Sequence, residues 1–197
     1  LALIGRFAKT PRYQGAGSSL IHPLKLDSAY DEMRARGLPV TYAQGYPMDS
    51  DQPDETLIAE ACQAAASAQV AVIFAGLPAS YESEGFDRKH MDMPQAHNEL
   101  IRRVCRAQPN TVVVLSGGAP VTMPWLDQTR ALLNLYLGGE AGGSAAVDLL
   151  YGDVNPSGKL AETYPIALED TPCYGNFAVH SLTTEYRESL YVGYRYY

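Results

Sequence analysis

The chain of 197 residues has few cysteines and few basic residues, and both scarcities exclude classes of structure and of binding partner. Its three cysteines, Cys62, Cys105 and Cys173, are odd in number and widely spaced, which argues against a disulfide framework and against a zinc site. Free thiols favour a reducing compartment such as the cytoplasm, while a periplasmic or secreted location stays open. The 15 Lys and Arg are outnumbered by 22 Asp and Glu, so the basic stripe that nucleic-acid binding needs is missing and nucleic acid is not expected as a partner.

Long apolar runs are also missing. No segment approaches the ~20 apolar residues that would span a bilayer, so no membrane partner is expected. The chain starts inside an apparent strand, without an initiator Met or a signal-peptide pattern, and we expect it to be cut from a longer protein. No metal or other cofactor is expected, because the four histidines show no metal-ligand spacing; they are His22, His90, His97 and His180.

Short apolar runs alternate with amphipathic stretches over most of the chain, and the hydrophobic content of 46% is that of a globular protein. We expect strands at residues 1–5, 40–42, 70–75, 111–115 and 131–135, and helices at 27–36 (capped by Asp27), 55–67, 95–107 and 141–150. The strands are continuously apolar, as they are when helices cover both faces of a parallel sheet. The predicted fold class is therefore α/β, a mostly parallel sheet sandwiched between helices (an α/β sandwich), with an irregular C-terminal tail.

The predicted tail begins where this alternation dissolves into turns. Residues 1–160 are predicted to form the α/β sandwich domain, which carries a long loop at 77–94. Residues 161–197 are predicted to be a C-terminal extension that wraps this domain or leads to a further domain.

Polar or glycine-rich segments follow four of the predicted strands, at residues 13–19, 77–94, 117–121 and 138–143. Because the carboxyl ends of parallel strands share one edge of the sheet, all four segments should gather where α/β proteins bind ligands. Two familiar chemistries do not fit these segments. The glycines at 138–143 lack the GxGxxG spacing of a dinucleotide site, and the chain has no GxSxG elbow of a serine hydrolase.

The loop at 77–94 is long for a connection between a strand and a helix, and such loops tend to be functional. Glu82 and Glu84 are two residues apart, so in extended backbone they point in opposite directions and only one is expected to enter a cleft. Asp87 and Arg88 are predicted to form a pair that pins the loop. A carboxylate in this place can act as a general acid/base, although on composition alone a solvated loop is the simpler interpretation.

Seven groups of motifs in the chain occur in a recognisable order. They are YQGAGSS (13–19), ESEGFDR (82–88) with MP (93–94), NTVVVL (110–115), GAPV (118–121) with PW (124–125), GGEAGG (138–143), DVNPSGKL (153–160) and YRE (186–188). Together they cover nearly the whole chain and resemble the C-terminal α/β sandwich domain of family 3 glycoside hydrolases, the β-glucosidase family. One departure is Ser189, where relatives usually have Gly; it is expected to alter a turn without touching the chemistry.

The resemblance implies a retaining, exo-acting hydrolase of the β-glucosidase type, which removes terminal non-reducing β-D-glucosyl residues in carbohydrate catabolism. Its aspartate nucleophile would lie on a separate barrel domain of the parent protein, and this chain is too short to include a barrel of about 250 residues. The expected partners are a β-glucoside or oligosaccharide substrate and that barrel domain, and an oligomer is left open. Holding half of an active site, the isolated chain is expected to be inactive.

The resemblance also assigns roles within the 77–94 loop. Glu84 directly precedes a glycine, as the acid/base does in the family, and Glu82 is the alternative. The segment at 13–19 would line the cleft or contact the barrel. The residues expected to bind substrate or to position the loop are Glu82, Asp87, Arg88 and Gln14.

A second interpretation is a non-catalytic carbohydrate-binding or interdomain interface module, in which neither glutamate matters for catalysis. Trp125 is of a type that stacks on sugar faces, but its position near a strand end favours burial against the sheet. Sugar and linkage specificity are not determined by the sequence, since the resemblance places most contacts to the sugar on the barrel.

Overall fold

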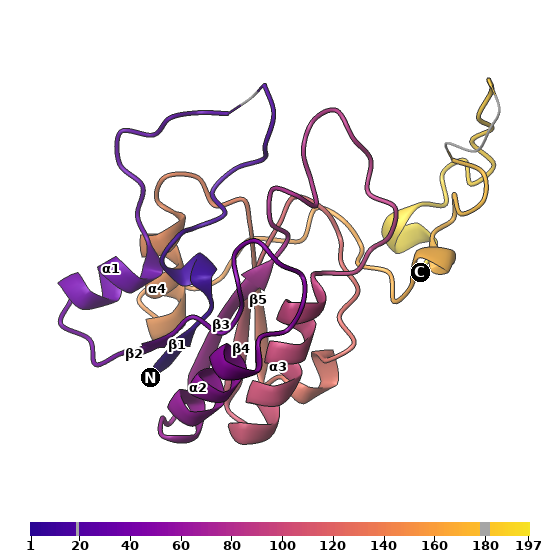
Figure 1. The fold of residues 1–197 in the computed structure, drawn as a ribbon. Coiled ribbons are helices and arrows are strands. Elements are labelled where there is room, and N and C mark those ends of the chain that lie inside the picture. The colour runs from indigo at the N-terminus through magenta and orange to yellow at the C-terminus, as the bar shows by residue number, and fades with distance from the viewer. Residues whose placement is uncertain (19, 178–181) are drawn as a thin grey trace.

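The computed structural model describes residues 1–18, 20–177 and 182–197 and contains a five-stranded, all-parallel sheet (Figure 1). The strands lie in the order β2-β1-β3-β4-β5. Their bounds are Ala2–Ile4 (β1), Thr41–Ala43 (β2), Ala71–Gly76 (β3), Thr111–Ser116 (β4) and Ala131–Tyr136 (β5). The predicted α/β class is confirmed, and each predicted strand is found with small shifts at its ends.

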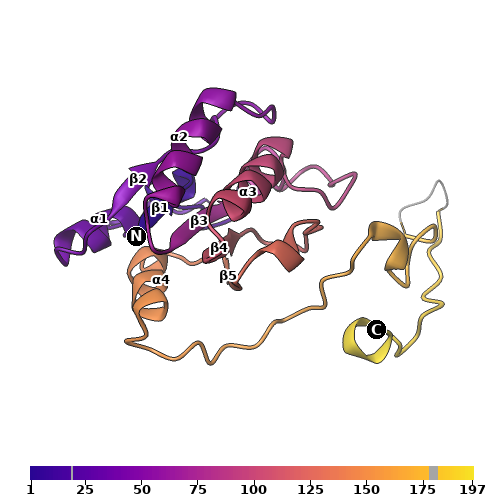
Figure 2. The same ribbon diagram turned by 90° about the horizontal axis from the view of Figure 1, so that it is seen from below.

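Helices cover both faces of the sheet (Figures 1 and 2). They are α1 (Ala29–Ala35), α2 (Glu55–Ala66), α3 (Gln95–Ala107) and α4 (Gly142–Tyr151). In β3, the side chains of Ala71, Ile73 and Ala75 belong to the core beneath α2 and α3. Those of Val72 and Phe74 belong to the core beneath α1 and α4. Because both faces of the strand are buried, its sequence is a continuous apolar run.

One predicted helix cap is wrong. The cap of α1 is Ser28 and not Asp27, because the Ser28 hydroxyl accepts the hydrogen bond from Asp31 N–H at 3.0 Å. Asp27 instead accepts a hydrogen bond from the hydroxyl of Ser144, in α4, at 2.9 Å. Both residue types cap helices well, and the contact with α4, which is remote in the sequence, decides between them.

Burial decides between two roles for several side chains. Trp125 is 1% exposed, so it is buried, as expected, and does not stack on a sugar; its ring N–H donates to Asn98 Oδ1, in α3, at 2.8 Å. Cys62, Cys105 and Cys173 are free thiols, as predicted.

In the described ranges, no helix is long and apolar enough to cross a membrane, and no cluster of His, Cys, Asp or Glu could hold a metal ion.

Beyond α4 the chain runs past the sheet and gathers into turns beside the 77–94 loop (Figure 2). The described part of this tail contains two short 3-10 helices, Leu168–Asp170 and Gly193–Arg195. The irregular tail was expected. The division into a domain at 1–160 and an extension at 161–197 remains a prediction.

Candidate functional site

The segments that follow β1, β3, β4 and β5 meet at the carboxyl edge of the sheet, as predicted (Figure 1). A backbone hydrogen bond from Gly139 N–H to Tyr13 O, at 2.9 Å, joins the segment after β5 to the segment after β1. The 77–94 loop lies against its neighbours on both sides, through the contacts given below. Of the residues singled out in the sequence, Ser19 and His180 lie outside the described part of the chain.

Glu82 is half-buried in the first half of the loop and is bound to the segment after β4. Both of its carboxylate oxygens accept a hydrogen bond from Gly118 N–H, Oε2 at 2.9 Å. The approach is close, since a Cβ on Gly118 would lie 2.9 Å from Glu82 Oε1. This carboxylate therefore anchors the loop to the sheet.

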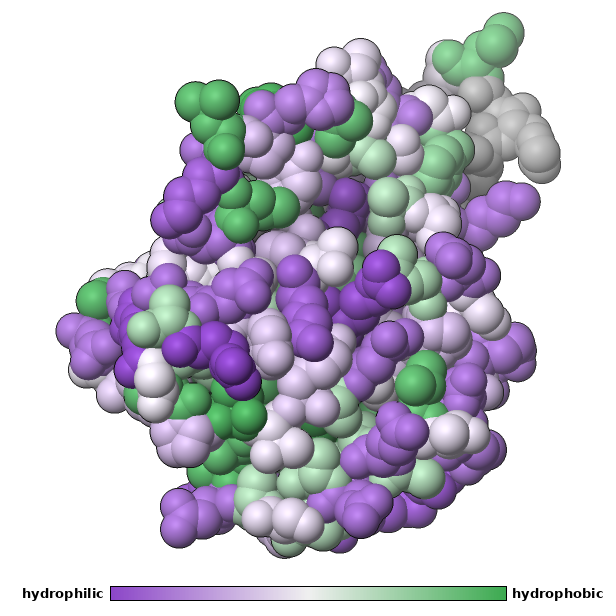
Figure 3. All heavy atoms as spheres, turned by 60° about the vertical axis from the view of Figure 1, so that its left-hand side comes forward, coloured by the Kyte–Doolittle hydropathy of each residue, from purple (hydrophilic) through white to green (hydrophobic). Residues whose placement is uncertain are grey.

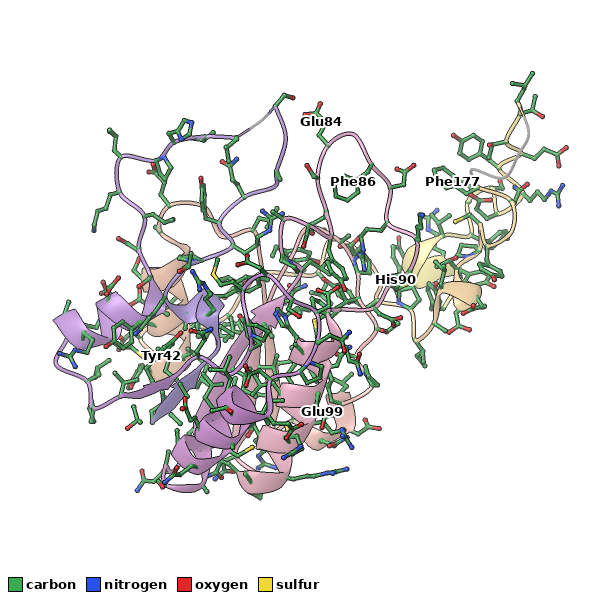
Figure 4. The ribbon with its side chains drawn as sticks, in the orientation of Figure 1. Tyr42, Glu84, Phe86, His90, Glu99 and Phe177 are labelled. Carbon is green, nitrogen blue, oxygen red and sulfur yellow. The ribbon has the colours of Figure 1, made fainter. Side chains whose placement is uncertain are left out.

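Glu84 stands at the exposed tip of the loop and points towards the neighbouring loop (Figure 4). Its Oε2 accepts hydrogen bonds from Ser18 N–H, at 2.7 Å, and from the Ser18 hydroxyl. The hydroxyl and then the N–H favour the charged carboxylate and hold the pKa of Glu84 below its ordinary value. Glu82 and Glu84 thus face different partners, as predicted, although Glu82 lies in a bend and Glu84 in a turn rather than in the extended backbone that was assumed.

Arg12 fastens the loop to the segment after β1, and the sequence did not reveal this role. Its guanidinium donates to three carbonyl oxygens: Leu77 O at 3.2 Å, Gln14 O at 2.6 Å and Glu82 O at 3.2 Å. A single arginine before a turn has no pattern that indicates such a contact. The one available signal was its place directly before the 13–19 segment.

The remaining predicted site residues lie in different surroundings. Gln14 Oε1 accepts a hydrogen bond from Ile21 N–H at 3.0 Å, so this side chain shapes its own segment. Asp87 is exposed, and the ion pairs of the described residues do not include one between Asp87 and Arg88. The predicted pinning pair is therefore not formed, because neighbouring side chains of an extended loop point apart. Arg88 holds the loop through Pro120 instead, with Nη1 donating to the carbonyl oxygen at 2.9 Å.

A cavity of about 620 Å³ separates the second half of the loop from the C-terminal tail. Arg88 lines it from the loop and Glu188 from the tail. Arg88 Nε and Nη2 and Glu188 Oε2 are buried without a hydrogen-bond partner among the described residues. Because buried polar atoms are nearly always hydrogen-bonded in folded proteins, these atoms mark a place for water or a polar ligand.

His97 supports the loop where it leaves the sheet. Its Nδ1 accepts a hydrogen bond from the N–H of Gly76, the last residue of β3, at 3.2 Å. Its ring lies 3.8 Å from the ring of Tyr46, between centroids. Burial lowers the pKa of His97 to about 4, so the side chain is neutral near pH 7. This buried histidine therefore has a structural role in the described part of the chain.

Apolar side chains are exposed on both loops beside Glu84. Leu20 and Ile21 are 51% and 62% exposed, and Phe86 at the tip of the 77–94 loop is 49% exposed. Figure 3 shows apolar patches among polar side chains at the top of the molecule, where the loop after β1 lies. Grouped apolar side chains of this kind mark surfaces that bind another protein part or a ligand.

Comparisons of the sequence place the chain among carbohydrate-active proteins. The family model described as the glycosyl hydrolase family 3 C-terminal domain matches residues 1–194. Thermostable beta-glucosidase B of Acetivibrio thermocellus is 54% identical over 200 residues, which cover 100% of this chain and 26% of that protein. The exo-alpha-(1->6)-L-arabinopyranosidase of Bifidobacterium breve is 43% identical, over 100% of this chain and 26% of that protein.

Solved structures agree with these matches. The crystal structure of a GH3 beta-glucosidase from Bifidobacterium adolescentis has a TM-score of 0.93 at 45% identity, covering 100% of this chain and 29% of that one. DesR, a beta-glucosidase from Streptomyces venezuelae solved in complex with D-glucose, has a TM-score of 0.89 at 26% identity, covering 99% and 38%. The chain spans only 26% of the length of the two curated relatives. By sequence and by fold, it belongs to the glycosyl hydrolase family 3 C-terminal domain family.

Proposed function

We propose that this domain supplies the general acid/base, Glu84, of a retaining, exo-acting β-glucosidase whose nucleophile lies on a barrel domain of the parent protein. The observation that carries the proposal is that the two carboxylates of the loop have different surroundings. Glu82 is bound to the backbone of Gly118, whereas Glu84 stands exposed at the ligand-binding edge of the sheet. The family and the three beta-glucosidases among the relatives and solved structures support the reaction class.

The chemistry needs one carboxyl group that first gives and then takes a proton. Glu84 would protonate the glycosidic oxygen while the bond to the anomeric carbon breaks and the nucleophile bonds to that carbon. It would then accept a proton from the water that attacks the same carbon and releases the nucleophile. The two carboxyl groups of a retaining enzyme lie only about 5 Å apart, so the loop tip must enter the mouth of the barrel. Exposed apolar side chains beside Glu84 suit such a docking surface.

The cavity between the loop and the tail is proposed as part of the sugar-binding cleft. The unpaired guanidinium N–H groups of Arg88 can donate to sugar hydroxyls, and the unpaired oxygen of Glu188 can accept from them. The proposed substrate is a terminal non-reducing β-D-glucosyl residue. One relative named as an arabinopyranosidase is 43% identical over this domain. We therefore assign the choice of sugar mainly to the barrel domain.

The test is hydrolysis of an aryl β-D-glucoside by the full-length parent protein. Glu84→Gln keeps the shape of the side chain but cannot transfer the proton, so the rate should fall roughly 100- to 10,000-fold. Glu82→Gln is the matched control and should retain much more activity. Full activity of Glu84→Gln would overturn the assignment, and inactivity of Glu82→Gln alone would move the role to Glu82. Full activity of both variants would favour the non-catalytic module.

A further inference from the structure

The side chain of Glu84 is held by one oxygen only. Oε2 accepts two hydrogen bonds from Ser18, whereas Oε1 has no hydrogen-bond partner among the described residues. The backbone is held as well, since Glu84 N–H donates to Ala16 O at 3.2 Å. Both contacts come from the segment after β1, with Ser18 lying 66 positions before Glu84 in the sequence.

Gly17 makes this close approach sterically feasible. A Cβ at this position would lie 2.4 Å from Glu84 Cβ, a distance that non-bonded carbon atoms do not adopt. Its φ of +110° is also a backbone conformation that glycine adopts readily and other residues avoid. Gly17 therefore lets the two loops meet, and the next residue supplies the hydrogen-bond donors.

We propose that Ser18 is a positioning residue for the acid/base: it fixes Oε2 of Glu84 and leaves Oε1 as the oxygen that carries the proton to and from the substrate. This inference rests on the proposed function of Glu84. A carboxylate bound through one oxygen keeps a defined rotation about its side-chain bonds, so the other oxygen has a defined direction. Two donors on Oε2 also stabilise the negative charge that forms when Glu84 has given up its proton.

The hydrogen bonds from Ser18 to Glu84 should affect the pH dependence of the hydrolysis rate. The donors of Ser18 lower the pKa of Glu84, and removing the hydroxyl should raise that pKa towards its ordinary range. A general acid with a raised pKa stays protonated to higher pH. The alkaline limb of kcat/KM, which reports the acid of the free enzyme, should therefore move to higher pH in Ser18→Ala.

The experiment compares Ser18→Ala with Ser18→Thr in the full-length parent, over a range of pH and with two aryl glucosides. With a poor leaving group, which needs protonation, kcat/KM of Ser18→Ala should fall about tenfold, the effect of losing one hydrogen bond to a charged group. With a 2,4-dinitrophenyl leaving group, which needs little protonation, the loss should be much smaller. Ser18→Thr keeps the hydroxyl and should restore both the rate and the position of the alkaline limb.

Two results would overturn the role of Ser18. One is an alkaline limb that stays in place in Ser18→Ala; the other is an equal loss of activity on both leaving groups, as expected from a purely structural change. Glu84→Gln, measured in parallel, separates the two proposals. An inactive Glu84→Gln together with an unchanged Ser18→Ala removes only the role of Ser18, whereas an active Glu84→Gln removes the proposed function itself.

Discussion

The base and the tip of the 77–94 loop are built in opposite ways. At the base, Glu82 is bound to Gly118, and Arg12 donates to the carbonyl oxygens of Leu77 and Glu82. At the tip, Glu84 is exposed, and its carboxylate is held by Ser18 of the neighbouring loop. The difference indicates that the hydrogen-bonded base of the loop holds the Glu84 carboxylate at the surface of the domain. Changes at the base should therefore affect stability and activity together, and changes at the tip should affect activity alone.

The largest structural effect is expected at Arg12. Arg12→Met removes the donors of three carbonyl oxygens, and the unfolding free energy should fall by about 3 kcal/mol, since each of these part-buried hydrogen bonds contributes about 1 kcal/mol. Chemical denaturation measures this change, and activity of the parent should fall with it. Arg34→Met, in an exposed turn of α1, is the control and should be neutral. Equal stability of the two variants would contradict the account of the base.

The pH dependence of stability that His97 causes is a second test of how the base of the 77–94 loop is supported. Its pKa in the folded chain, about 4, lies below the 6.5 of an unperturbed histidine, so between these values the unfolded chain takes up a proton that the folded chain does not. Stability should therefore fall by about 3 kcal/mol as the pH drops from 6.5 to 4. Denaturation of the wild type and of His97→Gln over this range measures the slope, which should be shallower in the variant.

The same experiment needs a control for the other titrating groups. His22 is exposed, and His22→Gln should keep the slope of the wild type. If His97→Gln leaves the pH dependence of the unfolding free energy unchanged, the buried ring is not the cause of the loss of stability at low pH.

A smaller effect is expected in the cavity beside the loop. Glu188→Gln replaces the carboxylate, whose Oε2 has no partner among the described residues, by an amide. If the cavity holds a sugar, KM of the parent should rise about tenfold, as for a lost charged hydrogen bond. The rate kcat should change little, since Glu188 takes no part in proton transfer. Glu169→Gln, an exposed change in the tail, is the control. An unchanged KM in Glu188→Gln would remove the cavity from the proposed cleft.

The smallest effect is expected at Ser189. Its φ of +51° is unusual for a residue with a side chain, and Ser189→Gly should relieve strain and stabilise the chain by about 0.5–1 kcal/mol. Thermal unfolding measures the gain, and Ser189→Ala, which keeps a Cβ, should show none. Equal midpoints of the two variants would show that the turn is not strained.

The helices and strands were predictable because their signal is local. The apolar run before the 77–94 loop indicated a strand buried on both faces, and β3 is such a strand. The left-handed glycine that ends α4, Gly152, was also predictable, since its φ of 80° suits glycine at a helix end. The family motifs added the expected function of the 82–88 segment.

The contacts that shape the candidate site were not predictable in the same way. Ser18 meets Glu84, and Arg12 meets Glu82, over separations of 66 and 70 positions in the chain, without any pattern in the sequence between them. The predicted pair of Asp87 with Arg88 rested on adjacency in sequence, which in extended backbone sends side chains to opposite sides. Long-range contacts of single side chains depend on the packed loops, and the sequence carries no periodic signal for them.

The most direct test of the central claim is the product formed by an alanine variant in the presence of azide. Glu84→Ala of the full-length parent, given 2,4-dinitrophenyl β-D-glucoside, should turn over slowly and be accelerated by azide, with β-glucosyl azide as the product. Azide attacks the glycosyl-enzyme intermediate without needing a general base, so it replaces the water that Glu84 would activate. Glu82→Ala should release glucose only. Glucosyl azide from Glu82→Ala, with none from Glu84→Ala, would contradict the assignment.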